Sequence, residues 1–182
     1  SSGNPPVEVD GRWILPLHAF SSSRSTRFSA YVASSDDGVT FSTPQLVLDG
    51  DAEGVAAAEP GVHVLPDGTV LMTLRSTSRW GSSDDGGRTW QLRTSPLDSA
   101  SRLASYVDSR GRVVSIYRSW AGYGAELRVS GDGGRTYGSP RVIATGPSRM
   151  DYAALVPLGG DRVLLVLAME FGNGDLSDVT AR

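Results

Sequence analysis

The sequence predicts an all-β protein, a β-propeller built from four-stranded blades. Two observations carry this prediction: one short motif recurs with a nearly constant period, and short apolar or alternating segments bounded by turn residues lie between its copies. In addition, no segment holds a convincing apolar face with helical spacing. A propeller blade of four strands occupies about 40 to 50 residues, which is the size of the repeat here.

The recurring motif starts at Ser35, Ser83 and Ser130. The second and third copies share the pattern Ser-x-Asp-x-Gly-x-Thr-aromatic, whereas the first lacks one glycine. The aspartate of each copy is suited to accept backbone N–H bonds within a turn, and the glycines allow a positive φ. We expect the aromatic residue that ends each motif to start the next strand and to pack into the core.

The second repeat shows the expected elements best. Its strands are predicted over 60–66, 69–75 and 90–93, with an Asp-Gly turn at 67–68. Extending this period divides the chain into repeats of roughly 1–50, 51–100, 101–149 and an incomplete 150–182, all within one partial propeller over 1–182. Because six blades would need about 300 residues, we expect a fragment of about three and a half blades.

Composition excludes several classes of function. The net charge is −3 and no basic stripe is present, which argues against a nucleic-acid partner. No apolar run approaches the length of a membrane span, and the chain has no cysteine for disulfide or thiolate chemistry. The sequence starts at Ser1 without a signal-peptide pattern. Because a leader would lie upstream of it, the compartment stays open, with secretion or the cell envelope favoured.

Aligning the inner hairpins of the repeats brings polar residues to shared positions. One position holds Glu59, Arg102 and Tyr152, and another holds Arg75 and Arg118. Equivalent strand ends of a propeller converge on one mouth of its channel, so we predict a common pocket lined by Glu59, Arg75, Arg118 and Tyr152. Each residue also has a structural interpretation, as a turn cap, a solvated strand end or a packed aromatic. Arg102 we interpret as structural.

The recurring motif resembles the Asp-box, or BNR repeat, of sialidases. The segment from Glu59 to Arg75 is similar to a sialidase segment in which a glutamate precedes two strands that end in arginine, and the segment 151–170 is similar to the one that carries the catalytic tyrosine. The resemblance implies a six-bladed sialidase-type propeller and an exo-α-sialidase-like glycosidase. It also implies Tyr152 as the nucleophile assisted by Glu59, with Arg75 and Arg118 gripping the substrate carboxylate.

The chemistry of the substrate explains these residue types. A sialic acid carries a carboxylate beside its anomeric carbon, which would repel a carboxylate nucleophile, so a neutral phenol with a neighbouring base is better suited. Arginine binds carboxylates with two parallel hydrogen bonds. The expected substrate is therefore a sialylated glycan or another acidic sugar, and no cofactor or metal is implied.

Two departures from the family pattern keep alternatives open. Nothing before Glu59 matches a general-acid aspartate or the first arginine of the triad, so we expect the 182 residues alone to be inactive. The loop 119–124, where a third arginine is usual, contains none, so Arg118 and Arg128 both remain possible. The alternatives are a non-catalytic Asp-box propeller that binds carbohydrate or protein, and another propeller glycosidase or lyase acting on a different acidic sugar.

Overall fold

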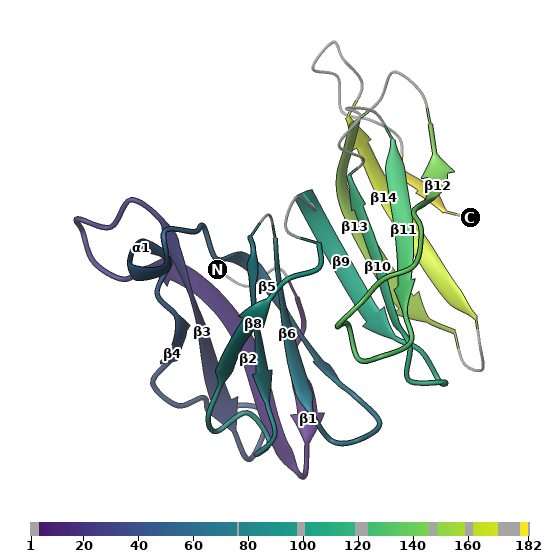
Figure 1. Ribbon diagram of the computed structural model, residues 1–182. Coiled ribbons are helices and arrows are strands. Elements are labelled where there is room, and N and C mark those ends of the chain that lie inside the picture. Colours follow the sequence, from purple (N-terminus) through teal and green to yellow (C-terminus); the bar gives the residue numbers. More distant parts are fainter. Residues whose placement is uncertain are drawn as a thin grey trace. The chain divides into compact units, whose positions relative to one another are not determined.

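The computed structural model describes residues 4–75, 77–97, 101–118, 124–145, 149–158, 162–170 and 179–181. It consists of antiparallel β-sheets in which consecutive strands are neighbours (Figure 1). The chain forms two compact units, Ser1–Asp98 and Ser99–Arg182. The prediction of an all-β protein made of four-stranded antiparallel sheets is confirmed.

The first unit contains two four-stranded sheets, each a simple meander. The first sheet comprises β1 (Val7–Val9), β2 (Arg12–Phe20), β3 (Phe28–Ser35) and β4 (Gln45–Leu48). The second comprises β5 (Ala58–Val64), β6 (Val70–Arg75), β7 (Arg79–Ser83) and β8 (Gln91–Thr94).

A single helical turn, α1 (Gly50–Glu53), joins the two sheets of the first unit. Asp49 caps it by accepting hydrogen bonds from the backbone N–H groups of Asp51 and Ala52. The sequence pattern does not predict this turn, because four residues are too few to show a helical period. In the described part of the chain, no helix is long and apolar enough to cross a membrane.

The described residues of the second unit form one four-stranded and one three-stranded sheet. The four-stranded sheet comprises β9 (Ser101–Val107), β10 (Val113–Arg118), β11 (Ala125–Ser130) and β12 (Arg141–Ala144). The other comprises β13 (Arg149–Pro157), β14 (Val163–Glu170) and β15 (Val179–Ala181).

Each unit has its own apolar core. In the first, β6 is buried on both faces, with Leu71, Met72 and Leu74 inaccessible to solvent, and Trp80 of β7 is fully buried beside it. In the second, the buried cluster consists of Ile116, Ala125, Met150 and Leu167. These cores hold the sheets of each unit together, because apolar burial contributes roughly 1.5–3 kcal/mol for each large side chain.

The recurring motif folds as the sequence predicts. Asp85 Oδ1 accepts hydrogen bonds from the backbone N–H groups of Arg88 and Thr89 at 2.9 and 2.8 Å, and from Ser83 Oγ at 2.7 Å. The third copy repeats these contacts around Asp132. Hydrogen bonds to the charged form, led by that from the threonine hydroxyl, hold the pKa of both aspartates far below the usual range.

The aromatic residue of each motif differs from expectation in one respect. Trp90 and its counterparts Phe41 and Tyr137 precede the next strand instead of starting it, and all three are only partly buried. Trp90 donates from its indole N–H to the carbonyl of Gly87 at 3.2 Å, and the Tyr137 hydroxyl lies 2.9 Å from that of Ser115. The polar atoms of Trp90 and Tyr137 thus form hydrogen bonds. Full burial in an apolar core would leave these atoms without partners.

The second copy of the motif also joins the two sheets of the first unit. Gly87 has a φ of +77°, and a Cβ at this position would collide with the Ile14 side chain of β2. Arg12 of β2 donates to the carbonyl of Gly86 and to Ser34 Oγ. The motif is therefore a packing element between neighbouring sheets. Glycine is needed at position 87 because of its positive φ and because there is no room for a Cβ beside Ile14.

Candidate active site

Glu59 lies in a β-bulge at the start of β5. Ala58 pairs with Arg75 and Gly61 pairs with Thr73, so the strand holds one extra residue between these pairs. Glu59 takes a φ of +50°, a conformation that costs a non-glycine residue about 1–3 kcal/mol. The bulge turns the Glu59 carboxylate toward Arg75, whose Nη1 donates to Oε1 at 2.7 Å. The side chains are 16% and 26% exposed, so the ion pair is accessible to a ligand.

His18 of β2 supports the same bulge from the neighbouring sheet. Its Nδ1 accepts a hydrogen bond from the backbone N–H of Glu59 at 3.3 Å. Burial lowers the pKa of His18, which favours the neutral ring that this hydrogen bond requires. With Nδ1 as the acceptor, the proton of the neutral imidazole resides on Nε2.

An equivalent bulge occurs in the second unit, at Arg102. Ser101 pairs with Arg118 and Ala104 pairs with Ile116, again with one extra residue, and Arg102 takes a φ of +55°. Its Nη1 donates to the Tyr152 hydroxyl at 2.6 Å, and its guanidinium carbon lies 4.5 Å from the centre of the tyrosine ring. Tyr152 is 50% exposed. A permanent positive charge therefore lies beside the hydroxyl of a half-exposed tyrosine.

The last repeat departs from the other two at this position. Tyr152 pairs regularly with Ala168, and the shift in register comes earlier on the strand, between Met150 and Tyr152. Arg118 of β10 donates from Nε to the carbonyl of Met150 at 2.6 Å. Tyr152 is thus the first regularly paired residue after the shift, and Arg118 anchors Met150, which lies directly before the shift.

The structure brings together Glu59 and Arg75 in the first unit. In the second unit it places Tyr152 against Arg102, a residue that the sequence leads us to interpret as structural. The hairpin alignment was the sequence signal that could have pointed to Arg102, because it puts Arg102 at the position of Glu59. A pocket shared by all four predicted residues stays a prediction. The side chain of Glu170 and the loop residues 119–123 lie outside the described residues.

The family follows from a comparison with family models. The model described as "BNR repeat-like domain" matches residues 3–177. The chain belongs to the BNR repeat-like domain family. No curated protein matches it.

Three solved structures illustrate the proteins to which this BNR repeat-like domain is similar in fold. A Dyadobacter fermentans protein of unknown function has a TM-score of 0.67 at 17% identity, over 97% of this chain and 62% of that one. An ulvan lyase of polysaccharide lyase family 25, bound to -[GlcA(1-4)Rha3S]-, has a TM-score of 0.68 at 12% identity, over 97% and 48%. A Hadza microbial sialidase has a TM-score of 0.60 at 19% identity, over 97% and 43%. At these identities the likeness concerns the fold, and the chain spans less than two thirds of each structure.

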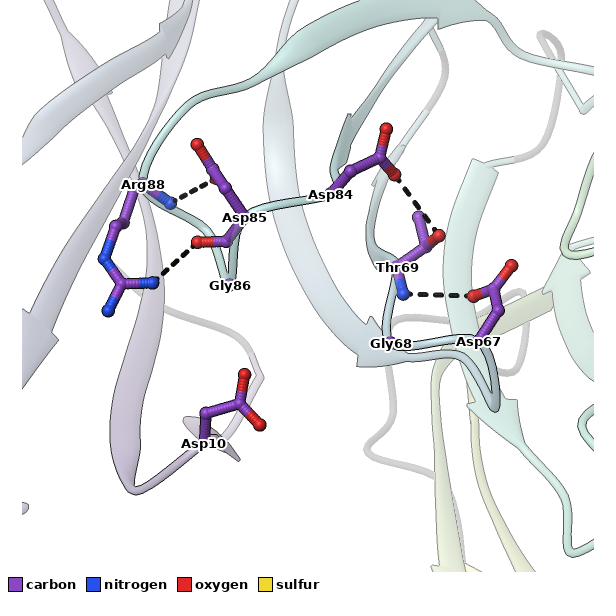
Figure 2. Close-up of a pocket in the computed structure, with 8 residues that line it drawn as sticks. All are labelled: Asp10, Asp67, Gly68, Thr69, Asp84, Asp85, Gly86 and Arg88. Atoms are coloured by element: carbon purple, nitrogen blue, oxygen red, sulfur yellow. Dashed lines mark hydrogen bonds between the residues drawn. The ribbon is translucent and has the colours of Figure 1, made fainter.

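A pocket of about 490 Å³ lies elsewhere in the first unit of this BNR repeat-like domain (Figure 2). It is formed by hairpin turns and the second Asp-box, and its lining residues are Asp10, Asp67, Gly68, Thr69, Asp84, Asp85, Gly86 and Arg88. Its carboxylates are used locally: Asp67 accepts from the backbone N–H of Thr69, and Asp84 from the Thr69 hydroxyl. These turns lie at the opposite end of β6 from Arg75. The pocket is therefore separate from the Glu59–Arg75 pair.

Within the described ranges, no three or more His, Cys, Asp or Glu side chains are grouped so that they could hold a metal ion. The described residues of the candidate site supply guanidinium, carboxylate, imidazole and phenol groups.

Proposed function

We propose that this chain carries part of the active site of a sialidase-like glycoside hydrolase, which releases terminal sialic acid or a related acidic sugar with Tyr152 as the nucleophile. The observation that carries the proposal is the pair of strained, charged residues Glu59 and Arg102. Both have a positive φ, both lie in equivalent bulges, and each contacts a residue that the resemblance assigns to catalysis or binding. Strain of this kind clusters at active sites.

Arg75 is suited to bind the substrate carboxylate. A guanidinium has five N–H donors, so Arg75 can keep its hydrogen bond to Glu59 while it binds a second carboxylate. The proposed role of Arg118 is the same. Its Nε donates to the carbonyl of Met150 at 2.6 Å, which fixes the guanidinium at this end of β10.

The proposed reaction proceeds in two steps. In the first, Tyr152 Oη attacks the anomeric carbon, its proton passes to the Glu59 carboxylate, and the glycosidic C–O bond breaks as the leaving oxygen takes a proton from a general acid not assigned in this chain. In the second, water attacks the anomeric carbon and gives a proton to the deprotonated general acid, while the C–Oη bond breaks and Oη takes its proton back from Glu59, so configuration is retained. Arg102 supports the first step because its positive charge stabilises the negative charge that develops on Oη.

The experiment is hydrolysis of a fluorogenic sialoside by the full-length protein and by its Tyr152→Phe variant. We expect kcat/KM to fall by at least ~10²-fold in the variant, with retained configuration in the product released by the wild type. Tyr106→Phe, on β9, is the matched control and should leave turnover unchanged. Turnover that survives Tyr152→Phe would exclude the tyrosyl mechanism. Binding of the sialoside without any turnover would instead favour the non-catalytic Asp-box propeller.

A second candidate is a lyase that acts on an acidic polysaccharide, and the Arg102–Tyr152 contact favours it. In a uronate lyase, a cation neutralises the sugar carboxylate while a base removes the neighbouring proton, and a phenol beside a guanidinium could fill these roles. The similar ulvan lyase structure holds an acidic sugar in the same fold. The two candidates differ in product, because only the lyase generates an unsaturated, ultraviolet-absorbing uronate.

A further inference from the structure

An exposed aromatic pair lies on the hairpin of β2 and β3. Phe20 and Phe28 are cross-strand partners whose rings stack with centroids 4.4 Å apart and planes at 21°. Phe20 is 52% exposed. One face of Phe20 is thus covered by Phe28, and much of the remaining ring is open to solvent.

This pair is continuous with the Glu59–Arg75 site. The ring of His18, two residues before Phe20 and on the same face of β2, meets the Phe28 ring edge-on with centroids 5.0 Å apart. The same His18 accepts the hydrogen bond from the backbone N–H of Glu59. In addition, the carbonyl of Phe28 accepts from the backbone N–H of Ala57, two residues before Glu59. The rings of His18, Phe28 and Phe20 therefore form a continuous row that starts at the Glu59 bulge.

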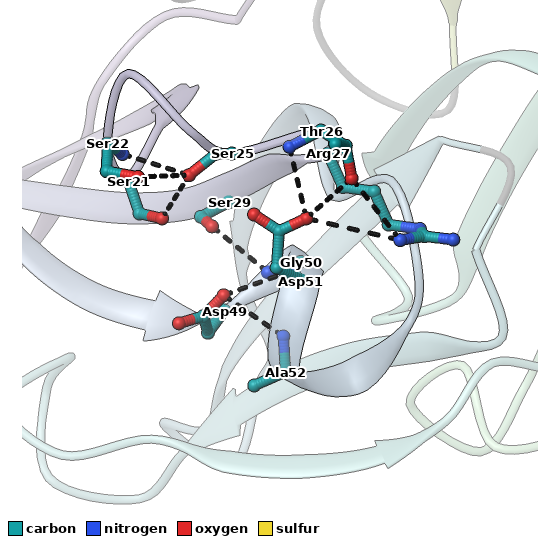
Figure 3. Close-up of polar contacts among 10 residues, drawn as sticks. All are labelled: Ser21, Ser22, Ser25, Thr26, Arg27, Ser29, Asp49, Gly50, Asp51 and Ala52. Atoms are coloured by element: carbon teal, nitrogen blue, oxygen red, sulfur yellow. Dashed lines mark hydrogen bonds and ion pairs between the residues drawn. The ribbon is translucent and has the colours of Figure 1, made fainter.

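A hydroxyl-rich loop follows Phe20 directly (Figure 3). The Ser25 hydroxyl lies 2.7 Å from that of Ser21 and accepts from the backbone N–H of Ser22 at 2.9 Å. The Thr26 hydroxyl donates to Asp51 of α1 at 2.9 Å. These contacts order the loop in advance, so a ligand that binds here loses less entropy on ordering its site.

We propose that Phe20, stacked on Phe28, is a sugar subsite that binds the pyranose ring attached to the acidic sugar. The inference rests on the proposed function, since it takes the acidic sugar to be held at Arg75. The chemistry fits a neutral pyranose. The ring has an apolar C–H face that packs on an exposed phenyl ring, and its rim of hydroxyls matches the donors and acceptors of Ser21, Ser22 and Ser25.

The test compares two ligands by titration calorimetry with the full-length protein carrying Tyr152→Phe, in which the proposed hydrolysis of both ligands is suppressed: the α-methyl glycoside of sialic acid and sialyllactose. The first carries the acidic sugar alone, and the second adds neutral pyranoses. We expect sialyllactose to bind more tightly, and Phe20→Ala to weaken its binding roughly 2- to 10-fold while leaving that of the methyl glycoside unchanged. Phe20→Trp should keep the preference. Leu46→Ala, which removes an exposed apolar side chain on β4, is the matched control.

The outcomes separate this inference from the proposed function. If Arg75→Gln abolishes binding of both ligands while Phe20→Ala leaves the sialyllactose preference intact, the subsite is wrong and the acidic-sugar site stands. If the Tyr152→Phe protein without further substitution binds neither ligand, both proposals fail. If Phe20→Ala lowers the affinity for both ligands equally, the substitution acts on the fold in general, and the subsite is again excluded.

Discussion

The guanidinium of Arg102 donates a hydrogen bond to the Tyr152 hydroxyl over 2.6 Å and lies across the face of the same ring, 4.5 Å from its centre. Arg102 reaches Tyr152 from a backbone conformation at φ +55°. The corresponding residue of the first unit, Glu59, adopts the same conformation and holds Arg75. Two hairpins thus keep a strained bulge at one position while they differ in the charge that it presents.

This relationship leads to a prediction for Arg102→Gln. The variant removes the positive charge beside Oη, so we expect kcat/KM on a sialoside to fall by roughly 10- to 150-fold, the effect of losing a charge-assisted hydrogen bond. The effect should appear mainly in kcat, because the charge on Oη develops during the reaction. Arg141→Gln, on the exposed β12 strand, serves as control. Equal rates for the two variants would argue that the Arg102–Tyr152 contact is structural only.

A second prediction concerns Arg75 and uses a neighbouring ion pair as its control. Arg75→Gln removes the proposed carboxylate-binding group and leaves Glu59 without its guanidinium, so we expect affinity for an acidic sugar to fall by at least ~10-fold. Arg79→Gln breaks a more exposed pair of the same chemistry, in which Nε lies 3.2 Å from Glu53 Oε2. It should have little effect on affinity. Similar losses in both variants would indicate that net charge, not the site, controls binding.

Local features of the fold were predictable because their chemistry is contained in a few adjacent residues. The Asp-box turn is one example: the spacing of serine, aspartate and glycine determines its hydrogen bonds, and the structure shows them around Asp85 and Asp132. The placement of Glu59 and Arg75 at the same end of their hairpin was predictable for a similar reason, although the bulge pairs Arg75 with Ala58. Counting outward from the Asp67-Gly68 turn sets the register of the hairpin.

Features that depend on a one-residue shift were not predictable. The alignment places Glu59, Arg102 and Tyr152 at one position, yet the first two lie in bulges and Tyr152 pairs regularly with Ala168. An inserted residue leaves no mark in an apolar–polar pattern when the bulge falls at a strand end. The contact of Arg102 with Tyr152 joins residues 50 positions apart. Such a contact depends on how sheets pack, which the repeat period does not encode.

A third prediction tests the packing role of the second Asp-box. Gly87→Ala would place a methyl group against Ile14 at a residue with φ +77°, so we expect a loss of roughly 2–4 kcal/mol in the free energy of unfolding. Gly68→Ala is the matched control, because its φ is +85° and nothing lies within 4 Å of the added Cβ. It should cost only the backbone penalty, roughly 1–2 kcal/mol. Urea denaturation measures both, and equal losses would show that the contact with Ile14 is unimportant.

The fourth prediction is that stability falls as the pH decreases from about 6.5 to 4. The chain has two histidines, and burial lowers the pKa of His63 to about 4, while its Nε2 lies 3.2 Å from the Thr73 hydroxyl. An unfolded histidine titrates near 6.5, so below that pH the unfolded chain takes up a proton that folded His63 does not bind until the pH approaches 4.

The stabilisation from neutral His63 is therefore complete above about pH 6.5 and is lost toward pH 4, by up to ~3 kcal/mol. His18, whose pKa is also lowered by burial, adds to the change in the same direction. The Asp-box aspartates, whose pKa values are lowered, lose their contribution only at still lower pH. His63→Gln keeps a hydrogen-bonding group but cannot titrate, so urea denaturation across this range should show a flatter profile than the wild type. An unchanged slope in the variant would mean that His63 titrates normally in the folded protein.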